Sequence, residues 1–197
     1  MNHHARIFVC ALVLFAPASV KATPGGQDGQ KWKPYQFTGN ERYEYKVIMN
    51  DGDEKKEMGY VLDIRKKGEE DWDVTWSIKS PMKKTAGPEV LMGGMGMGLS
   101  PGLLLMNPLF GAFLEQVELK EGEKMSLFGA GVIKVTKKET VGGRTGFTCE
   151  LFTKQDDKDQ LTWVCTVDPA LALPIRSVTV DGGKEKYRLD LVSYKKD

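Results

Sequence analysis

Apolar and polar residues alternate along most of the chain, and a period of two is typical of half-buried antiparallel strands. Before the turn signal at 50–52, the apolar positions on one face are Tyr43, Tyr45, Val47 and Met49. Beyond that turn, and on both sides of a polar stretch at 66–71, they are Tyr60, Leu62, Ile64, Trp72, Val74, Trp76 and Ile78. A hairpin centred on Gly68 pairs Ile64 with Trp72 and keeps these positions on one face. The sequence therefore predicts a sheet with one face against a core and the other against water.

The C-terminal half repeats this alternation. A strand that contains Val135 leads through Gly142-Gly143 into the strand of Cys149, and a bulge at the two glycines is needed to place Val135 opposite Cys149. At the end of the chain, a tight Asp-Gly-Gly-Lys turn predicts a hairpin in which Val178 lies opposite Tyr187. The pattern favours a mainly β fold, a curved antiparallel sheet or half-barrel of about eight to nine strands.

A sheet with one apolar face must be covered, and the segment 85–114 is the candidate cover. Its part from Val90 to Leu114 holds no charged residue, whereas 28% of the whole chain is charged. Met92, Met95 and Met97 lie there in a glycine-rich loop. The apolar residues that follow, which include Leu104, Phe110 and Phe113, would surround a short helix on nearly all sides. We expect this short apolar helical segment to be buried and to cover the concave face of the sheet.

Three interpretations of the apolar segment 85–114 are open. It is the plug of the core, a mobile lid over a cavity that binds acyl chains or another apolar ligand, or a loop that dips into a bilayer. A membrane-spanning helix is disfavoured, because Pro101, the Asn107-Pro108 pair and several glycines interrupt the segment.

The N-terminus has the pattern of a secretory signal peptide. Residues 1–22 combine Arg6, an apolar run over 7–16 and small residues before Thr23. They predict export across the inner membrane to the periplasm. The Gly- and Pro-rich stretch 23–38 is expected to be a flexible lead-in, and 39–197 a single β-rich domain, since this length supports one sizeable core.

Composition argues against several classes of function. His3 and His4 are the only histidines, so no imidazole after Thr23 is available for a catalytic triad or a metal. Without Arg6 and Lys21 the basic residues fall from 28 to 26 against 27 acidic ones, which gives no electrostatic basis for binding nucleic acid. We expect no enzymatic activity, no cofactor and no metal. The acidic turns at 51–54 and 156–159 are interpreted as solvated turns, with weak calcium binding as the minor alternative.

Cys149 and Cys165 remain after the predicted cleavage, and an even pair in an oxidising compartment favours a disulfide. Folding the two strands about the polar turn between them places Cys149 opposite Cys165 and Leu151 opposite Trp163. Directly opposed Cα atoms in such a pair lie about 4.5 Å apart, which a disulfide can span. The sequence therefore predicts a structural Cys149–Cys165 bridge; two buried free thiols and a redox pair are the alternatives.

Two stretches carry a resemblance to a known family: GNERYEYKV near the start and WVCTVDPALALPIRSVTVDGGKEKYRLDLV near the end. They resemble exported bacterial proteins of unknown function that share an early Gly-Glu-x-x-Tyr strand and a late Trp, Asp, Pro-x-Arg run. The matching positions are Gly39, Glu41, Tyr45, Trp163, Asp168, Pro174 and Arg176, with Asn40 inserted between the Gly and the Glu. That family is similar in architecture to the outer-membrane lipoprotein carriers, whose half-open β-barrel holds acyl chains under a helical lid. The resemblance implies this architecture here, although no residue matches a carrier's acyl-release machinery.

The sequence thus predicts a periplasmic, non-enzymatic protein that binds lipid or lipoprotein acyl chains and contacts the membrane transiently through 90–114. The predicted ligand-binding residues are Tyr45, Val47, Tyr60, Leu62, Val74, Trp76, Met92, Met95, Met97, Leu104, Phe110, Phe113, Leu151, Trp163 and Tyr187. The alternative is a protein–protein interaction or structural module of the cell envelope, with a filled core and no small-molecule site.

Overall fold

Nine strands and one helix make up the described part of the chain. The computed structural model describes residues 30–51, 54–69, 71–79, 108–129, 131–155 and 158–197. The predicted signal peptide 1–22 lies outside these residues, as do Met92, Met95, Met97 and Leu104 of the predicted lid.

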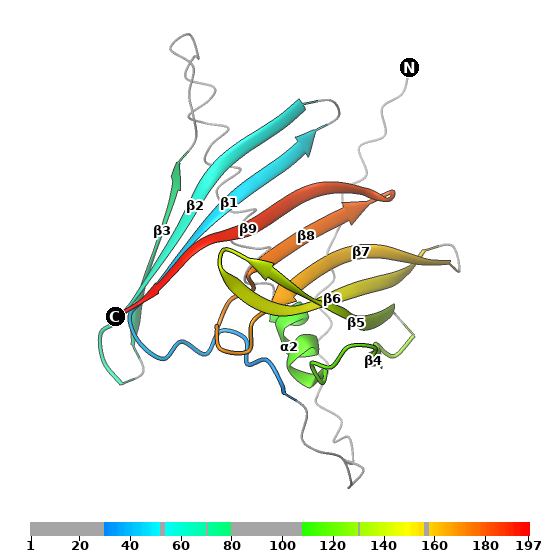
Figure 1. Ribbon diagram of the computed structural model, residues 1–197, viewed down its shortest axis with the longest axis horizontal. Coiled ribbons are helices and arrows are strands. Elements are labelled where there is room, and N and C mark those ends of the chain that lie inside the picture. Colours follow the sequence, from blue (N-terminus) through cyan, green and yellow to red (C-terminus); the bar gives the residue numbers. More distant parts are fainter. Residues whose placement is uncertain (1–29, 52–53, 70, 80–107, 130, 156–157) are drawn as a thin grey trace, which may run out of the picture.

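The strands form one antiparallel sheet that does not close into a barrel (Figure 1). Their bounds are β1 Glu41–Asp51, β2 Glu54–Lys66, β3 Trp72–Lys79, β4 Lys124–Ser126, β5 Gly131–Val141, β6 Arg144–Gln155, β7 Lys158–Val167, β8 Arg176–Asp181 and β9 Lys184–Lys196. The order β3-β2-β1-β9-β8-β7-β6-β5-β4 leaves β3 and β4 at the two edges. The prediction of a mainly β fold built on an open, curved antiparallel sheet is confirmed.

Alternation divides the sheet into a core face, which carries most of the buried side chains, and an outer face. On β1 the core face holds the predicted set Tyr43, Tyr45, Val47 and Met49, all of which are buried. The β2–β3 hairpin keeps the predicted faces but not the predicted register, because Ile64 lies opposite Val74 and not Trp72. The loop is wider than expected, since the Lys67 amide donates to the Asp71 carbonyl at 2.9 Å. A shift of two positions leaves every side chain on its predicted face.

The central hairpins confirm the predicted pairing around the cysteines. Cys149 lies opposite both Val135 and Cys165, and Leu151 lies opposite Trp163. The predicted bulge at Gly142-Gly143 is wrong, because these glycines form a tight two-residue turn with φ values of 56° and 75°. The irregularity lies between Val135 and Lys137 instead, where one extra residue restores the register.

The last hairpin corrects another prediction. Val178 lies opposite Arg188 and not Tyr187, because the register shifts by one residue between Thr179 and Val180. A one-residue shift exchanges the two faces of a strand. The predicted pairing of Val178 with Tyr187 would place the neighbouring Ser177 on the face toward water. Instead, Ser177 is fully buried on the core face, where its hydroxyl accepts a hydrogen bond from Trp163 Nε1 at 2.8 Å.

Helix α2, Pro108–Gln116, is short and overlaps only the end of the predicted apolar segment 85–114. Leu114 of α2 is fully buried, whereas Ala112, Glu115 and Gln116 are exposed. The expectation of a helix buried on nearly all sides is therefore wrong for the described turns of α2. The chain has already returned to charged residues at Glu115, so the end of the helix presents one buried side and one solvated side.

Candidate functional site

The core face over β5, β6 and β7 is closed by other parts of the chain. Its buried cluster combines strand residues such as Ile133 and Trp163 with Leu114 of α2 and with Trp32. The predicted ligand-binding residues Leu151 and Phe113 pack against the same cluster. Phe110 lies in α2, but the structure does not describe its side chain. This part of the core face is filled by the chain itself.

The first described residues of the chain contribute a core anchor. Trp32 is 1% exposed and donates from Nε1 to the Leu171 carbonyl at 2.7 Å. Tyr35 follows and packs on α2 so closely that a Cβ at Gly111 would lie 2.6 Å from Tyr35 Cε2. The alternation of the strands gave no indication of this role, because Trp32 lies in an irregular stretch with Gly and Pro.

The core face over β1, β2 and β9 is also closed. Four predicted ligand-binding residues lie there, all almost completely buried: Tyr45, Val47, Tyr60 and Leu62. They share one cluster with Leu173 and Ile175, which precede β8. Tyr45 is fixed by a hydrogen bond from its hydroxyl to the Pro174 carbonyl at 2.9 Å, and burial raises the pKa of that hydroxyl. A ligand role for these four residues stays a prediction; their packing is that of a core.

Edge strand β3 differs from the rest of the core face. Val74, Trp76 and Ile78 lie opposite the buried residues of β2, yet they are 41%, 56% and 37% exposed. The start of β3 is better covered, since the Trp72 ring lies 6.2 Å from that of Phe37. We refer to Val74, Trp76 and Ile78 as the β3 strip. Tyr187, the remaining predicted ligand-binding residue, is 36% exposed near the start of β9, where it lies opposite Met49 and away from this strip.

A buried polar cluster surrounds Glu41 at the start of β1. The Glu41 carboxylate accepts hydrogen bonds from the Tyr43 hydroxyl at 2.5 Å and from the Thr38 amide at 2.8 Å. Burial, followed by the hydrogen bond to Glu41, raises the pKa of Tyr43. Every partner is satisfied within the chain, which indicates a structural cluster.

Four of the residues that carry the family resemblance thus hold the described fold together. They are Glu41, Tyr45, Trp163 and Pro174, each in a hydrogen bond that links segments or fixes a neighbouring side chain. Two more make ion pairs: Asp168 with Arg144 at 2.7 Å, and Arg176 with Asp190 at 2.6 Å. These contacts give the six residues a structural role in this chain and assign none of them to a ligand.

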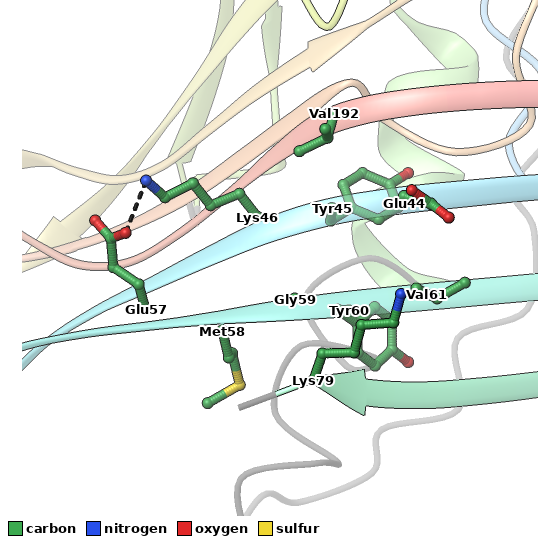
Figure 2. A pocket seen from close by; sticks show the side chains of 10 residues that line it. All are labelled: Glu44, Tyr45, Lys46, Glu57, Met58, Gly59, Tyr60, Val61, Lys79 and Val192. Carbon is green, nitrogen blue, oxygen red and sulfur yellow. Dashed lines mark ion pairs between the residues drawn. The ribbon is translucent and has the colours of Figure 1, made fainter. Parts of the chain in front are cut away.

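The outer face carries a shallow depression over Gly59 (Figure 2). Gly59 has no side chain to fill the space between its cross-strand neighbours Lys46 and Lys79, which leaves a volume of about 380 Å³. Figure 2 shows Lys46 and Glu57 pointing toward one another, and their charged atoms are 2.8 Å apart. The hydrogen bond from Lys46, followed by that from Lys55, lowers the pKa of Glu57.

The charges around this depression are matched. Glu44 accepts hydrogen bonds from Arg42 at 2.8 Å and from Ser193 at 3.2 Å, and the Arg42 bond is the main cause of its lowered pKa. Because the carboxylates and ammonium groups around the depression lie close together in solvent, it does not favour an ion of either sign.

The predicted disulfide is not formed. Cys149 and Cys165 lie directly opposite one another, as expected, but both are free and buried. Burial raises the pKa of Cys149 to about 12 and that of Cys165 well above its ordinary value. Thiolates, not neutral thiols, carry out disulfide exchange, so burial in the cluster beneath α2 makes both groups unreactive.

No protein-family model, curated protein or solved structure matches the chain. Among the described residues, no helix combines the length and apolar character that crossing a membrane requires. Within the same residues, no group of three or more His, Cys, Asp or Glu side chains is arranged to hold a metal ion. In the part of the chain that the structure describes, the β3 strip is the surface on which large apolar side chains are exposed side by side.

Proposed function

We propose that the chain is a non-enzymatic protein of the cell envelope that binds acyl chains of lipids or lipoproteins against the core face of β3. One observation carries the proposal: Val74, Trp76 and Ile78 remain exposed on a face that is buried on the neighbouring strand. Scattered single apolar residues are ordinary on protein surfaces, but three consecutive positions on one strand face form a contiguous apolar surface.

The chemistry of the β3 strip suits an acyl chain. Its side chains are one aromatic and two branched aliphatic groups, without a polar atom other than the indole N–H of Trp76. An acyl chain gains about 0.8 kcal/mol for each methylene group that it removes from water. Alternate side chains on one face of a strand repeat at about 7 Å. The three side chains of the β3 strip therefore offer a surface as long as several methylene groups.

A positive charge lies at one end of this surface. Lys66 is the cross-strand neighbour of Trp72, and its ammonium group lies 5.9 Å from the centre of the Trp72 ring. A lipid with an anionic headgroup would pair that headgroup with Lys66 while its acyl chain follows Val74, Trp76 and Ile78. The apolar strip and the lysine together favour an amphiphile over a purely apolar molecule.

Two further expectations support the proposal. The N-terminal pattern predicts export to the periplasm, a compartment bounded by lipid bilayers. The resemblance to proteins with the architecture of lipoprotein carriers implies an open half-barrel, and the described sheet is open.

The experiment is native mass spectrometry of the chain, purified without detergent and then incubated with phosphatidylglycerol or a palmitoylated peptide. We expect adducts of lipid mass that are lost on the substitution Val74→Asp. Val192→Asp is the matched control, since Val192 is also exposed, at 57%, but lines the outer-face depression. A chain without adducts under all conditions would instead favour the interaction or structural module with a filled core. Equal loss of adducts in both variants would place the ligand elsewhere.

A further inference from the structure

Edge strand β3 is an open end of the sheet. Within the described residues no strand lies beyond it, so one side of an eight-residue strand presents unpaired backbone N–H and C=O groups. Natural edge strands are protected from pairing by proline, by charges that point to the core face or by small length. Residues 72–79 contain no proline, and their core-face positions carry no charge.

The sequence of β3 is self-complementary about Trp76. If two antiparallel copies of the strand are aligned so that Trp76 lies opposite itself, Val74 lies opposite Ile78. On the outer face of the same alignment, Asp73 lies opposite Lys79, and two small hydroxyl residues, Thr75 and Ser77, lie opposite each other. Apolar positions thus meet apolar positions, and opposite charges meet twice.

We propose that two copies of this chain associate edge to edge through β3, with a two-fold axis at Trp76. The two sheets then continue into one another, and their core faces stay on the same side because the axis is perpendicular to the sheet. The partner is a second copy of this chain and not an unrelated strand, because Asp73 and Lys79 of β3 pair with Lys79 and Asp73 of a second β3 that runs in the opposite direction.

The charges select this alignment over its neighbours. Shifts by one position place apolar side chains opposite polar ones and are disfavoured. Among the alignments that keep the faces, only the one centred on Trp76 places Asp73 opposite Lys79. Within one copy, Asp73 already lies 2.7 Å from Lys67, but both side chains are more than half exposed, so the carboxylate stays accessible to a second lysine.

Pairing of two edges does not depend on the proposed acyl-chain function. The charges that test the pairing, on Asp73 and Lys79, lie on the outer face, whereas the proposed ligand lies on the core face. Association would bring the two β3 strips side by side as one longer apolar surface. Loss of the dimer and loss of lipid adducts are therefore separate results.

The test is sedimentation velocity of the full purified chain over a series of concentrations. We expect a monomer–dimer equilibrium with a dissociation constant in the micromolar range, as for small interfaces. Asp73→Lys and Lys79→Asp each replace two attractive pairs by two repulsive ones and should weaken the dimer roughly tenfold or more. An equimolar mixture of the two variants should recover a heterodimer, since each Lys then meets an Asp.

The mixture also answers the objection that a variant has merely misfolded, because recovery requires both variants to be folded. Lys67→Gln is the control: it removes the partner of Asp73 within one copy and should leave the dimer unchanged. A chain that stays monomeric at every concentration would overturn the proposal. A dimer that is insensitive to both charge reversals, or a mixture that fails to recover, would overturn it as well.

Discussion

The core face has two contrasting regions, one over β5, β6 and β7 and one on β3. In the first, side chains such as Ile133 and Val135 have no measurable or almost no exposure, since α2 and Trp32 lie over them. On β3, the same alternation of apolar and polar residues produces side chains that are up to 56% exposed. The strands do not differ in pattern; they differ in what covers them.

This contrast shows that an apolar residue on the core face can have either of two roles, in stability or in binding. Where a second layer is present, the apolar side chain contributes to the stability of the fold, and its loss leaves a cavity. Where none of the described residues covers it, the side chain contributes little to stability and is available to a ligand or partner. Stability measurements and binding measurements should therefore respond to different residues.

The largest expected effect comes from removing the anchor of the covered region. Trp32→Ala should lower the free energy of unfolding by about 3–5 kcal/mol, because it empties a fully buried site and removes the hydrogen bond to Leu171. Trp76→Ala should lower it by less than about 1 kcal/mol, since the ring is already half in water. Urea unfolding of both variants checks the contrast, and similar losses would show that the β3 strip is as well packed as the covered region.

A smaller difference is expected between two strand glycines. A Cβ at Gly146 in β6 would lie 2.5 Å from the Val167 carbonyl oxygen, so Gly146→Ala should cost about 1–3 kcal/mol through displacement of the paired backbone. At Gly59 the nearest atom is Lys79 Cβ at an ordinary 3.4 Å. Gly59→Ala should therefore be neutral or stabilise by up to about 1 kcal/mol. Thermal unfolding measures the stability of both variants. A larger loss for Gly59→Ala than for Gly146→Ala would contradict the close backbone approach at Gly146 and the ordinary contact at Gly59.

The smallest effect concerns the two cysteines of the covered region. At pH 8, native protein should leave Cys149 and Cys165 unmodified by iodoacetamide, while a thiol introduced on β3 by Thr75→Cys reacts rapidly. After denaturation without a reductant, peptide mapping should find both native cysteines alkylated. A disulfide-linked peptide would contradict the free thiols of the structure.

The buried thiol of Cys149 should also make the folded chain less stable at alkaline pH. Burial raises the pKa of Cys149 from 9.0 to about 12, so the folded chain keeps a proton that the unfolded chain releases. The stabilisation is fully present below pH 9.0 and is lost as the pH rises toward about 12. Cys149→Ala should reduce the slope of unfolding free energy against pH in this window, and an unchanged slope would exclude the thiol as a contributor.

The sequence predicted the strands, their core-facing residues and the Cys149–Cys165 alignment, because a period of two and short turns are local properties. It failed where a single extra residue changes the register: the irregularity at Thr179 exchanged the faces of Ser177 and Val178. Nothing local marks such a bulge, since its cost is offset by packing across the sheet. The hydrogen bond of Trp32 could not be predicted for a similar reason, because its acceptor, the Leu171 carbonyl, lies far along the chain.

The candidate site was predicted only in outline. Val74 and Trp76 were expected to line a pocket together with Tyr45 and Leu62, and alternation did place all four on one face. Alternation cannot tell which part of a face is covered, because covering depends on segments distant in sequence. The structure separates the two exposed residues from the two buried ones, which narrows the proposed ligand surface to β3.

The most direct test of the proposed acyl-chain surface is quenching of tryptophan fluorescence by a brominated fatty acid, since bromine quenches only at close range. Trp32 and Trp163 are buried and Trp76 is the most exposed of the four tryptophans, so Trp76 is the natural reporter. We predict saturable quenching in the native chain that is largely lost in Trp76→Phe and is displaced by an unlabelled fatty acid. Quenching that is absent, or that persists unchanged in Trp76→Phe, would contradict an acyl chain lying along β3.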